Sequence, residues 1–177
     1  MLTRIVRTAT VSFLPIALLL AFTPAAFTQN RLQPDVALGW FAASNGQILP
    51  GTFVAGSEIG RPLYLCRANY GNGTHPGKIV GNYCNISWGG WEVFTPNYEV
   101  LTAPRSVRLI WIAASNGRVP PGAMVGGNEK GQSLYVCRAA YQDGLHPGKV
   151  IDRNCNIGWG GREVLRPNYE VLVLEDS

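Results

Sequence analysis

The chain has 177 residues, and its 15 lysines and arginines against 11 aspartates and glutamates give a formal net charge of +4. Setting aside residues 1–28 as a leader removes Arg4 and Arg7, which lowers this charge to +2 (+4 minus 2). A net charge this low, carried by basic residues that do not cluster, argues against nucleic acid as a partner. What remains, residues 29–177, suffices for one compact domain or two small ones.

The N-terminal segment, residues 1–28, has the pattern of a secretory signal peptide. Arg4 and Arg7 supply the positive start, Val11–Ala21 is an apolar run, and small residues follow. The run is shorter than the roughly 20 residues of a membrane span, although an uncleaved anchor is the alternative. We therefore expect a secreted or extracytoplasmic protein without stable membrane insertion.

The rest of the chain predicts short strands separated by turns, since 21 glycines and 12 prolines leave no long stretch for a helix. The strand candidates of the first half are Gly39–Ala43, Thr52–Val54, Leu63–Ala68, Lys78–Val80, Asn85–Trp88 and Tyr98–Leu101. The turn dipeptides between them are Asn45-Gly46, Pro50-Gly51, Asn72-Gly73, Pro76-Gly77 and Gly89-Gly90. This pattern predicts an all-β fold.

The second half of the chain repeats the first at a constant offset, so that Trp40 returns as Trp111. Trp40–Leu101 and Trp111–Leu172 align without a gap and share 37 of 62 positions. We place the two repeats at residues 39–101 and 110–172, because a fixed period identifies the structural unit. Repeats this small bury little surface alone. The linker between them, Thr102–Arg108, is too short to separate two globules. We therefore expect two antiparallel β repeats packed as one body with an approximate twofold axis, with strand exchange between them as a further expectation.

The cysteines lie in two pairs with the same spacing, Cys66 with Cys84 and Cys137 with Cys155. In an exported protein this spacing indicates disulfides, and pairing within each repeat is the simplest of three connectivities. The rival is a metal site that includes His75 and His146. Two cysteines and one histidine per repeat fall short of a structural zinc set, so we expect neither metal nor cofactor.

Seven of the polar positions that are identical in both repeats are the candidates for function. They are Glu58/Glu129, Arg67/Arg138, His75/His146, Lys78/Lys149, Asn85/Asn156, Glu92/Glu163 and Glu99/Glu170. Structural interpretations exist for several of them. Arg67 has Glu92 or Glu99 as an ion-pair partner within the repeat, and His75 supports a turn at Pro76-Gly77.

Glu58 and Lys78 differ from these because both stand beside glycine turns. Polar groups on rigid turns suit a small hydroxylated ligand, since the carboxylate accepts from sugar hydroxyls and the ammonium donates to them. A surface ion pair is the equally weighted alternative. Enzymatic activity is not expected: no nucleophile motif is present, oxidised cysteines exclude Cys–His catalysis, and nothing makes the glutamates converge as a glycosidase requires.

A longer pattern runs through both repeats. It reads Trp-x4-Asn-Gly-x3-Pro-Gly-x2-Val-x-Gly-x-Glu-x-Gly, followed by Leu-Tyr-x-Cys-Arg-Ala, His-Pro-Gly-Lys, Cys-Asn-Ile, Trp-Gly-Gly-x-Glu and Tyr-Glu-Val-Leu. This pattern resembles the DM-nine repeat family, which occurs in invertebrate mannose-binding lectins and in the lectin-like part of natterin-type pore-forming toxins. The resemblance covers Trp40–Leu101 and Trp111–Leu172.

The resemblance implies an all-β body of two tandem repeats joined by strand exchange, in some members dimerised further, so a homodimer is a further expectation. It also implies mannose binding through the acid after Val-x-Gly and the lysine of Pro-Gly-Lys. These positions are Glu58 with Lys78, and Glu129 with Lys149. The acid is Glu where the mannose binders have Asp, and its longer reach leaves the choice of sugar open. Cysteine is unusual in this family at the Leu-Tyr-x-Cys-Arg position. Its presence indicates a disulfide acquired by a protein that works outside the cell.

The leading hypothesis is a secreted, non-enzymatic protein that binds mannose-type or related glycans at two similar shallow sites. Trp88 and Trp159 are the candidate stacking faces for a sugar ring. Two sites per chain convert weak affinity into avidity on a glycan-coated surface. The alternative is a non-catalytic structural or protein-interaction module in which the Glu and Lys pair with each other. The third is the recognition half of a toxin, without pore formation by this chain alone.

Overall fold

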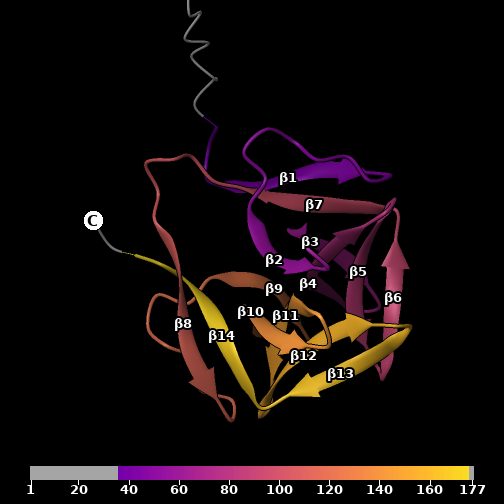
Figure 1. The fold of residues 1–177 in the computed structure, drawn as a ribbon, viewed down its shortest axis with the longest axis vertical. Helices are drawn as coiled ribbons and strands as arrows, with labels where there is room; N and C mark the ends of the chain where they lie inside the picture. The colour runs from indigo at the N-terminus through magenta and orange to yellow at the C-terminus, as the bar shows by residue number, and fades with distance from the viewer. Residues whose placement is uncertain (1–35, 176–177) are drawn as a thin grey trace, which may run out of the picture. The chain divides into compact units, whose positions relative to one another are not determined.

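The computed structural model describes residues 36–175, so the predicted signal peptide, residues 1–28, lies outside the described part. The described part contains 14 strands (Figure 1). They are β1 (Gly39–Ser44), β2 (Val54–Glu58), β3 (Arg61–Tyr70), β4 (Gly73–Val80), β5 (Tyr83–Trp88), β6 (Trp91–Thr95), β7 (Asn97–Thr102), β8 (Leu109–Ser115), β9 (Val125–Glu129), β10 (Gln132–Tyr141), β11 (Gly144–Ile151), β12 (Asn154–Trp159), β13 (Arg162–Arg166) and β14 (Asn168–Leu174). The all-β prediction is confirmed. None of the described residues belongs to a helix with the length and apolar character that a membrane crossing requires.

Each sequence repeat forms seven strands with the same internal antiparallel pairing. In the first repeat, β7 lies between β1 and β3, β3 also pairs with β2 and β4, and β5 lies between β4 and β6. Strands β8 to β14 repeat this arrangement. Figure 1 shows the first set, indigo to rose, beside the second set, brick red to yellow.

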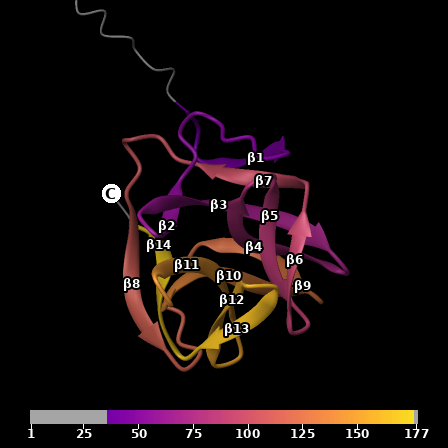
Figure 2. The ribbon, with the colours of Figure 1, turned by 45° about the vertical axis from the view of Figure 1, so that its right-hand side comes forward.

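Three strand edges join the two sets into one body. β2 pairs with β11, β4 with β9, and β6 with β13, all antiparallel. The succession β3–β2–β11–β10–β9–β4–β3 closes a six-stranded ring to which each repeat contributes three strands. The β5–β6 and β12–β13 hairpins lie outside this ring and meet through the pairing of β6 with β13, as both views show (Figures 1 and 2). Neither repeat closes the ring alone, which confirms the expected two-repeat body.

The buried core is divided in the same way as the strands. Each repeat has an apolar cluster that includes its own two cysteines, and a third cluster is shared. The shared cluster contains Leu65 and Leu101 of the first repeat with Val136 and Leu172 of the second, all at most 1% exposed. Burial of such side chains contributes about 1.5–3 kcal/mol each. The two repeats therefore stabilise each other through side chains that neither would bury alone.

The structure corrects the turn predicted at Pro76-Gly77, because both residues lie inside β4. A Cβ at Gly77 would stand 2.1 Å from the carbonyl oxygen of Asn85. The glycine therefore permits a close approach of β5 to β4 and does not form a turn. The strand prediction also omitted β6, which follows the correctly predicted Gly89-Gly90 turn, where both residues have positive φ.

Both disulfides form within a repeat, Cys66 with Cys84 and Cys137 with Cys155, as the simplest connectivity predicts. We expect thiol titration of the denatured protein, purified without reductant, to detect no free thiol before reduction. After reduction it should detect 4 per chain. Any stoichiometric thiol signal before reduction would contradict this assignment.

Candidate functional site

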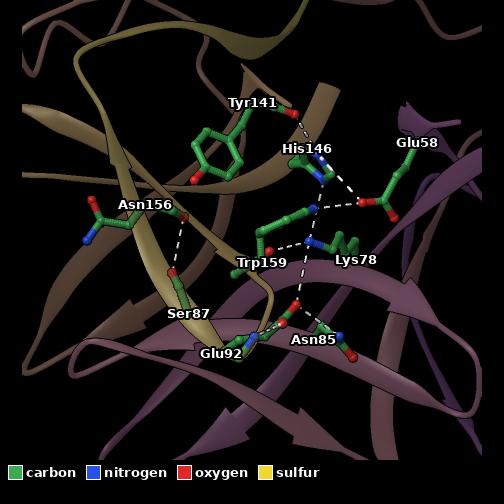
Figure 3. A network of polar contacts seen from close by, with 11 residues as sticks. Glu58, Lys78, Asn85, Ser87, Glu92, Tyr141, His146, Asn156 and Trp159 are labelled. Atoms are coloured by element: carbon green, nitrogen blue, oxygen red, sulfur yellow. Dashed lines mark hydrogen bonds and ion pairs between the residues drawn. The ribbon is translucent and has the colours of Figure 1, made fainter. Parts of the chain in front are cut away.

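The polar residues common to both repeats gather in two equivalent networks, each built from both repeats. The Lys78 network contains Glu58, Lys78, Asn85 and Glu92 of the first repeat with Tyr141, His146, Gly158 and Trp159 of the second (Figure 3). The Lys149 network contains Glu129, Lys149, Asn156 and Glu163 of the second repeat with Tyr70, His75, Ser87 and Trp88 of the first.

Lys78 is the centre of the first network. Its side chain crosses from β4 to the other repeat, where the ammonium donates to the carbonyl oxygen of Gly158. The Nζ atom also lies 3.5 Å from Nδ1 of His146 and 3.6 Å from Oε1 of Glu92, so that Lys78 stands between them in Figure 3. Lys78 is 2% exposed, and a charge buried this deeply requires such partners. The lysine therefore ties the two repeats together.

His146 is fully buried and links Lys78 to Glu58. Its Nε2 lies 3.2 Å from the carbonyl oxygen of Tyr141. A carbonyl only accepts, so the hydrogen-bond network assigns the proton to Nε2 and leaves Nδ1 to accept from Lys78. Nε2 also lies 4.0 Å from Oε1 of Glu58. Burial, followed by the charge of Lys78, lowers the pKa of His146, so the imidazole is neutral at pH 7.

Glu58 brings the network to the protein surface. This residue ends β2, and its Oε1 accepts a hydrogen bond of 2.8 Å from Nε1 of Trp159. The Glu58 side chain is 31% exposed, and no residue of the part 36–175 donates a hydrogen bond to its Oε2. Tyr141 packs edge-on against Trp159, with ring centroids 5.3 Å apart. The result is an anchored carboxylate with a free oxygen beside an aromatic pair.

Glu92 holds the opposite end of the network. Its Oε1 accepts from Nδ2 of Asn85 at 3.0 Å, and its Oε2 accepts from the backbone N–H of Gly161 at 2.9 Å. Gly161 belongs to the turn between β12 and β13, so a carboxylate of the first repeat fixes a hairpin of the second. Glu163 acts in the same way on the backbone N–H of Gly90, at 2.9 Å.

The Lys149 network repeats these hydrogen bonds, although no close ion pair joins Lys149 to Glu163 among the described residues. Lys149 donates to the carbonyl oxygen of Ser87, and its Nζ lies 3.1 Å from Nδ1 of His75. Nε1 of Trp88 donates to Oε1 of Glu129 at 2.9 Å. The two networks are therefore duplicates of one design in which each lysine has acceptors from the other repeat.

One position distinguishes the two networks, because Ser87 occupies the place that Gly158 has in the other repeat. The Ser87 hydroxyl donates to the carbonyl oxygen of Asn156 at 3.1 Å. A Cβ at Gly158 would stand 2.9 Å from Cγ of Glu92. A serine there would require the Glu92 side chain to shift.

Burial shifts the pKa of both lysines. It lowers the pKa of Lys149 to about 8, against the opposing charges of Glu163 and Glu129. Burial lowers the pKa of Lys78 as well, with Glu92 and Glu58 acting in the opposite direction. Carboxylates on both sides thus favour the charged form of these lysines and oppose the effect of burial.

The structure brings each predicted Glu–Lys pair into one network but corrects the predicted position of the lysines. Lys78 and Lys149 lie inside strands and are buried, and the Pro76-Gly77 turn beside which the sequence interpretation placed Lys78 is part of the same strand. Trp88 and Trp159 lie at the sites. Trp88 donates a hydrogen bond to Glu129 and Trp159 donates one to Glu58, each across the two repeats. The sequence interpretation missed the histidines' contact with the lysines, although their recurrence before Pro-Gly-Lys was a signal.

The remaining shared pair, Arg67 and Glu99, lies outside the networks. Their Nε and Oε2 atoms are 2.7 Å apart, which confirms the predicted ion pair with Glu99 and excludes Glu92 as the partner. The guanidinium also lies 4.5 Å from the ring centroid of Trp40. Among the described residues no group of three or more His, Cys, Asp or Glu side chains is placed to hold a metal ion. An open groove of about 460 Å³ lies elsewhere, lined by Phe53 and residues of the segment 103–110.

Comparisons with known proteins agree with this architecture. The profile of the DM9 repeat matches residues 57–153 and 128–177. Among solved structures, the nematode sperm cell motility protein MFP2B superimposes with a TM-score of 0.60 at 15% sequence identity. The match covers 82% of this chain and 49% of that protein, so the chain spans about half of its length and the likeness concerns the fold. Curated protein sequences contain no significant match.

Proposed function

Because the chain belongs to the DM9 repeat family, we propose that it is a non-enzymatic carbohydrate-binding protein with two similar sites. One site is built around Glu58 and Lys78, and the other around Glu129 and Lys149. Mannose-type glycans are the ligands that the family resemblance favours. Two disulfides are consistent with an oxidising compartment, and we propose that the protein acts outside the cell.

The observation that carries the proposal is the state of the Glu58 carboxylate. One oxygen is anchored by Trp159, and the side chain remains 31% exposed. A preorganised carboxylate accepts from vicinal hydroxyls in charge-assisted hydrogen bonds, without loss of its own rotamer freedom on binding. The neighbouring indole and phenol rings provide an apolar surface for the C–H face of a sugar.

Lys78 supports this carboxylate from inside the protein. Its ammonium already faces Gly158, His146 and Glu92, so a sugar hydroxyl that reaches the lysine must replace one of these acceptors. Nδ1 of His146, at 3.5 Å, is the most weakly bound of the hydrogen-bond acceptors. We assign direct ligand contact to Glu58 and a supporting role to Lys78.

Glycan-array binding tests the site through Glu58→Gln/Glu129→Gln. Glutamine retains an acceptor for the tryptophan N–H but loses the charge, so we expect roughly tenfold weaker binding at each site. Glu99→Gln/Glu170→Gln is the matched control, because it makes the same chemical change at glutamates that face Arg67 and Arg138. Unchanged binding by the first variant would refute the site assignment.

A second function, a structural or protein-interaction module, is favoured by one observation. Both network lysines donate their hydrogen bonds inside the protein. Neither lysine therefore needs a ligand to satisfy its ammonium group. The same array separates the two functions. Failure of the wild-type protein to bind any glycan would exclude the lectin function and favour the module.

A further inference from the structure

Four side chains form one row across the strands between the two candidate sites. Trp88 lies opposite Trp91, Trp91 opposite Arg162, and Arg162 opposite Trp159, in the successive strands β5, β6, β13 and β12. Directly opposed residues of antiparallel strands project from the same face of a sheet. The row therefore lies on one face and crosses the junction between the repeats.

Each end of this row belongs to a candidate site. Trp88 donates its indole N–H to Glu129, at 2.9 Å, and Trp159 donates to Glu58, at 2.8 Å. Strands β5 and β12 also lie against each other, since the Ser87 hydroxyl donates to the carbonyl oxygen of Asn156 at 3.1 Å, so the row follows a short, curved path from one tryptophan to the other. A chain of several linked sugars is long enough to reach from one site to the other.

The centre of the row is exposed and has no side-chain partner among the described residues. Trp91 is 65% exposed, and Arg162 is exposed as well. Within residues 36–175, Arg162 forms no ion pair and Trp91 stacks on no other ring. The two residues occupy equivalent positions of the two repeats. They therefore meet at the pseudo-twofold axis, and this Trp–Arg pair occurs once in the chain.

The hairpins under this pair are fixed by contacts between the repeats. Glu163 accepts from the N–H of Gly90, and Glu92 accepts from the N–H of Gly161, each at 2.9 Å. The backbone adds bonds of 3.2 Å from Glu92 to Gly161 and 3.0 Å from Glu163 to Gly90. Trp91 and Arg162 thus stand on a preorganised support, which lowers the entropic cost of binding.

We propose that Trp91 and Arg162 form a central subsite that joins the two candidate sites into one surface for an extended, acidic oligosaccharide. This inference rests on the proposed function and specifies its ligand. The exposed indole packs against the C–H face of a sugar ring, and the unpaired guanidinium binds a carboxylate or sulfate on that sugar.

Isothermal titration calorimetry tests the subsite with three probes: mannose, a neutral linear mannose oligosaccharide, and a uronate-containing oligosaccharide of the same length. The wild type should bind the acidic oligosaccharide roughly tenfold more tightly than mannose, since stacking and one charged contact are worth about that factor. Trp91→Ala and Arg162→Gln should lose this gain and keep the affinity for mannose. Phe94→Ala is the matched control, because Phe94 is an aromatic residue of β6, 52% exposed, on the opposite face.

The outcomes separate the subsite from the proposed function. If mannose binds but the gain for the acidic oligosaccharide is absent, or survives Trp91→Ala, the subsite is refuted and the two sites stand. If Trp91→Ala weakens all three probes equally, the residue acts on the sites and the subsite is also refuted. If no probe binds the wild type, the proposed function fails, and the subsite fails with it.

Discussion

Replacing Lys78 by methionine is expected to lower the free energy of unfolding by about 3–5 kcal/mol. Methionine fills a similar volume but leaves the buried carboxylate of Glu92, whose side chain is 5% exposed, without its cation at 3.6 Å. It also leaves the carbonyl oxygen of Gly158 without its donor. Urea unfolding at pH 7 measures the change.

Two further variants locate the cause of this loss. Lys78→Met/Glu92→Gln should recover part of the stability, because the neutral amide removes the stranded charge and still accepts from Asn85. Glu175→Gln is the control, since it breaks a surface pair with Arg108 and should change stability by no more than about 0.5 kcal/mol. If Lys78→Met is as mild as this control, the ammonium has no role in holding the repeats together.

Stability is expected to rise with pH above 8, by up to about 1.4 kcal/mol per pH unit. The pKa of Lys149 is about 8 in the folded protein and 10.5 as its ordinary value in the unfolded chain. Between these values the folded lysine has lost a proton that the unfolded lysine retains. The unfolded state then binds more protons, so raising the pH favours the folded state. The lowered pKa of Lys78 acts in the same direction.

Urea unfolding at half-unit steps from pH 8.0 to 9.5 measures this slope. Few other side chains titrate in this window, because the chain has only three lysines and two of them belong to the networks. The raised pKa values of Tyr98 and Tyr169 act in the opposite direction at higher pH. Lys149→Met should flatten most of the slope. A wild-type slope of zero over this window would show that the ammonium is as well stabilised inside the protein as in water.

Acidification is expected to lower stability as the pH falls below about 6.5. The pKa values of both His75 and His146 are lowered by burial and by the neighbouring lysine. Below the ordinary value of 6.5 the unfolded histidines bind protons that the folded ones refuse, so stability is lost. His146→Gln should reduce this loss in thermal unfolding at pH 5 relative to pH 7. An equal loss in that variant would assign the acid sensitivity to other groups.

The fold was largely predictable because its signals are local and occur twice. The return of Trp40–Leu101 as Trp111–Leu172 identified the repeat, and the turn dipeptides excluded long helices. The cysteines were equally informative, since their matched spacing gave the pairing found in the structure. Pro76-Gly77 misled for a physical reason: the dipeptide favours a turn locally, but the contact of Gly77 with Asn85 on the next strand requires glycine in an extended one.

The sequence by itself determined the repeated unit, its disulfides, and which polar residues are candidates for function, including Glu58 and Lys78. Only the tertiary structure decided where their partners come from. The acceptors of Lys78 lie 68 and 80 residues away, in His146 and Gly158. The reason is that a ring closed by strands of both repeats sets these contacts through long-range strand register, which no local pattern encodes.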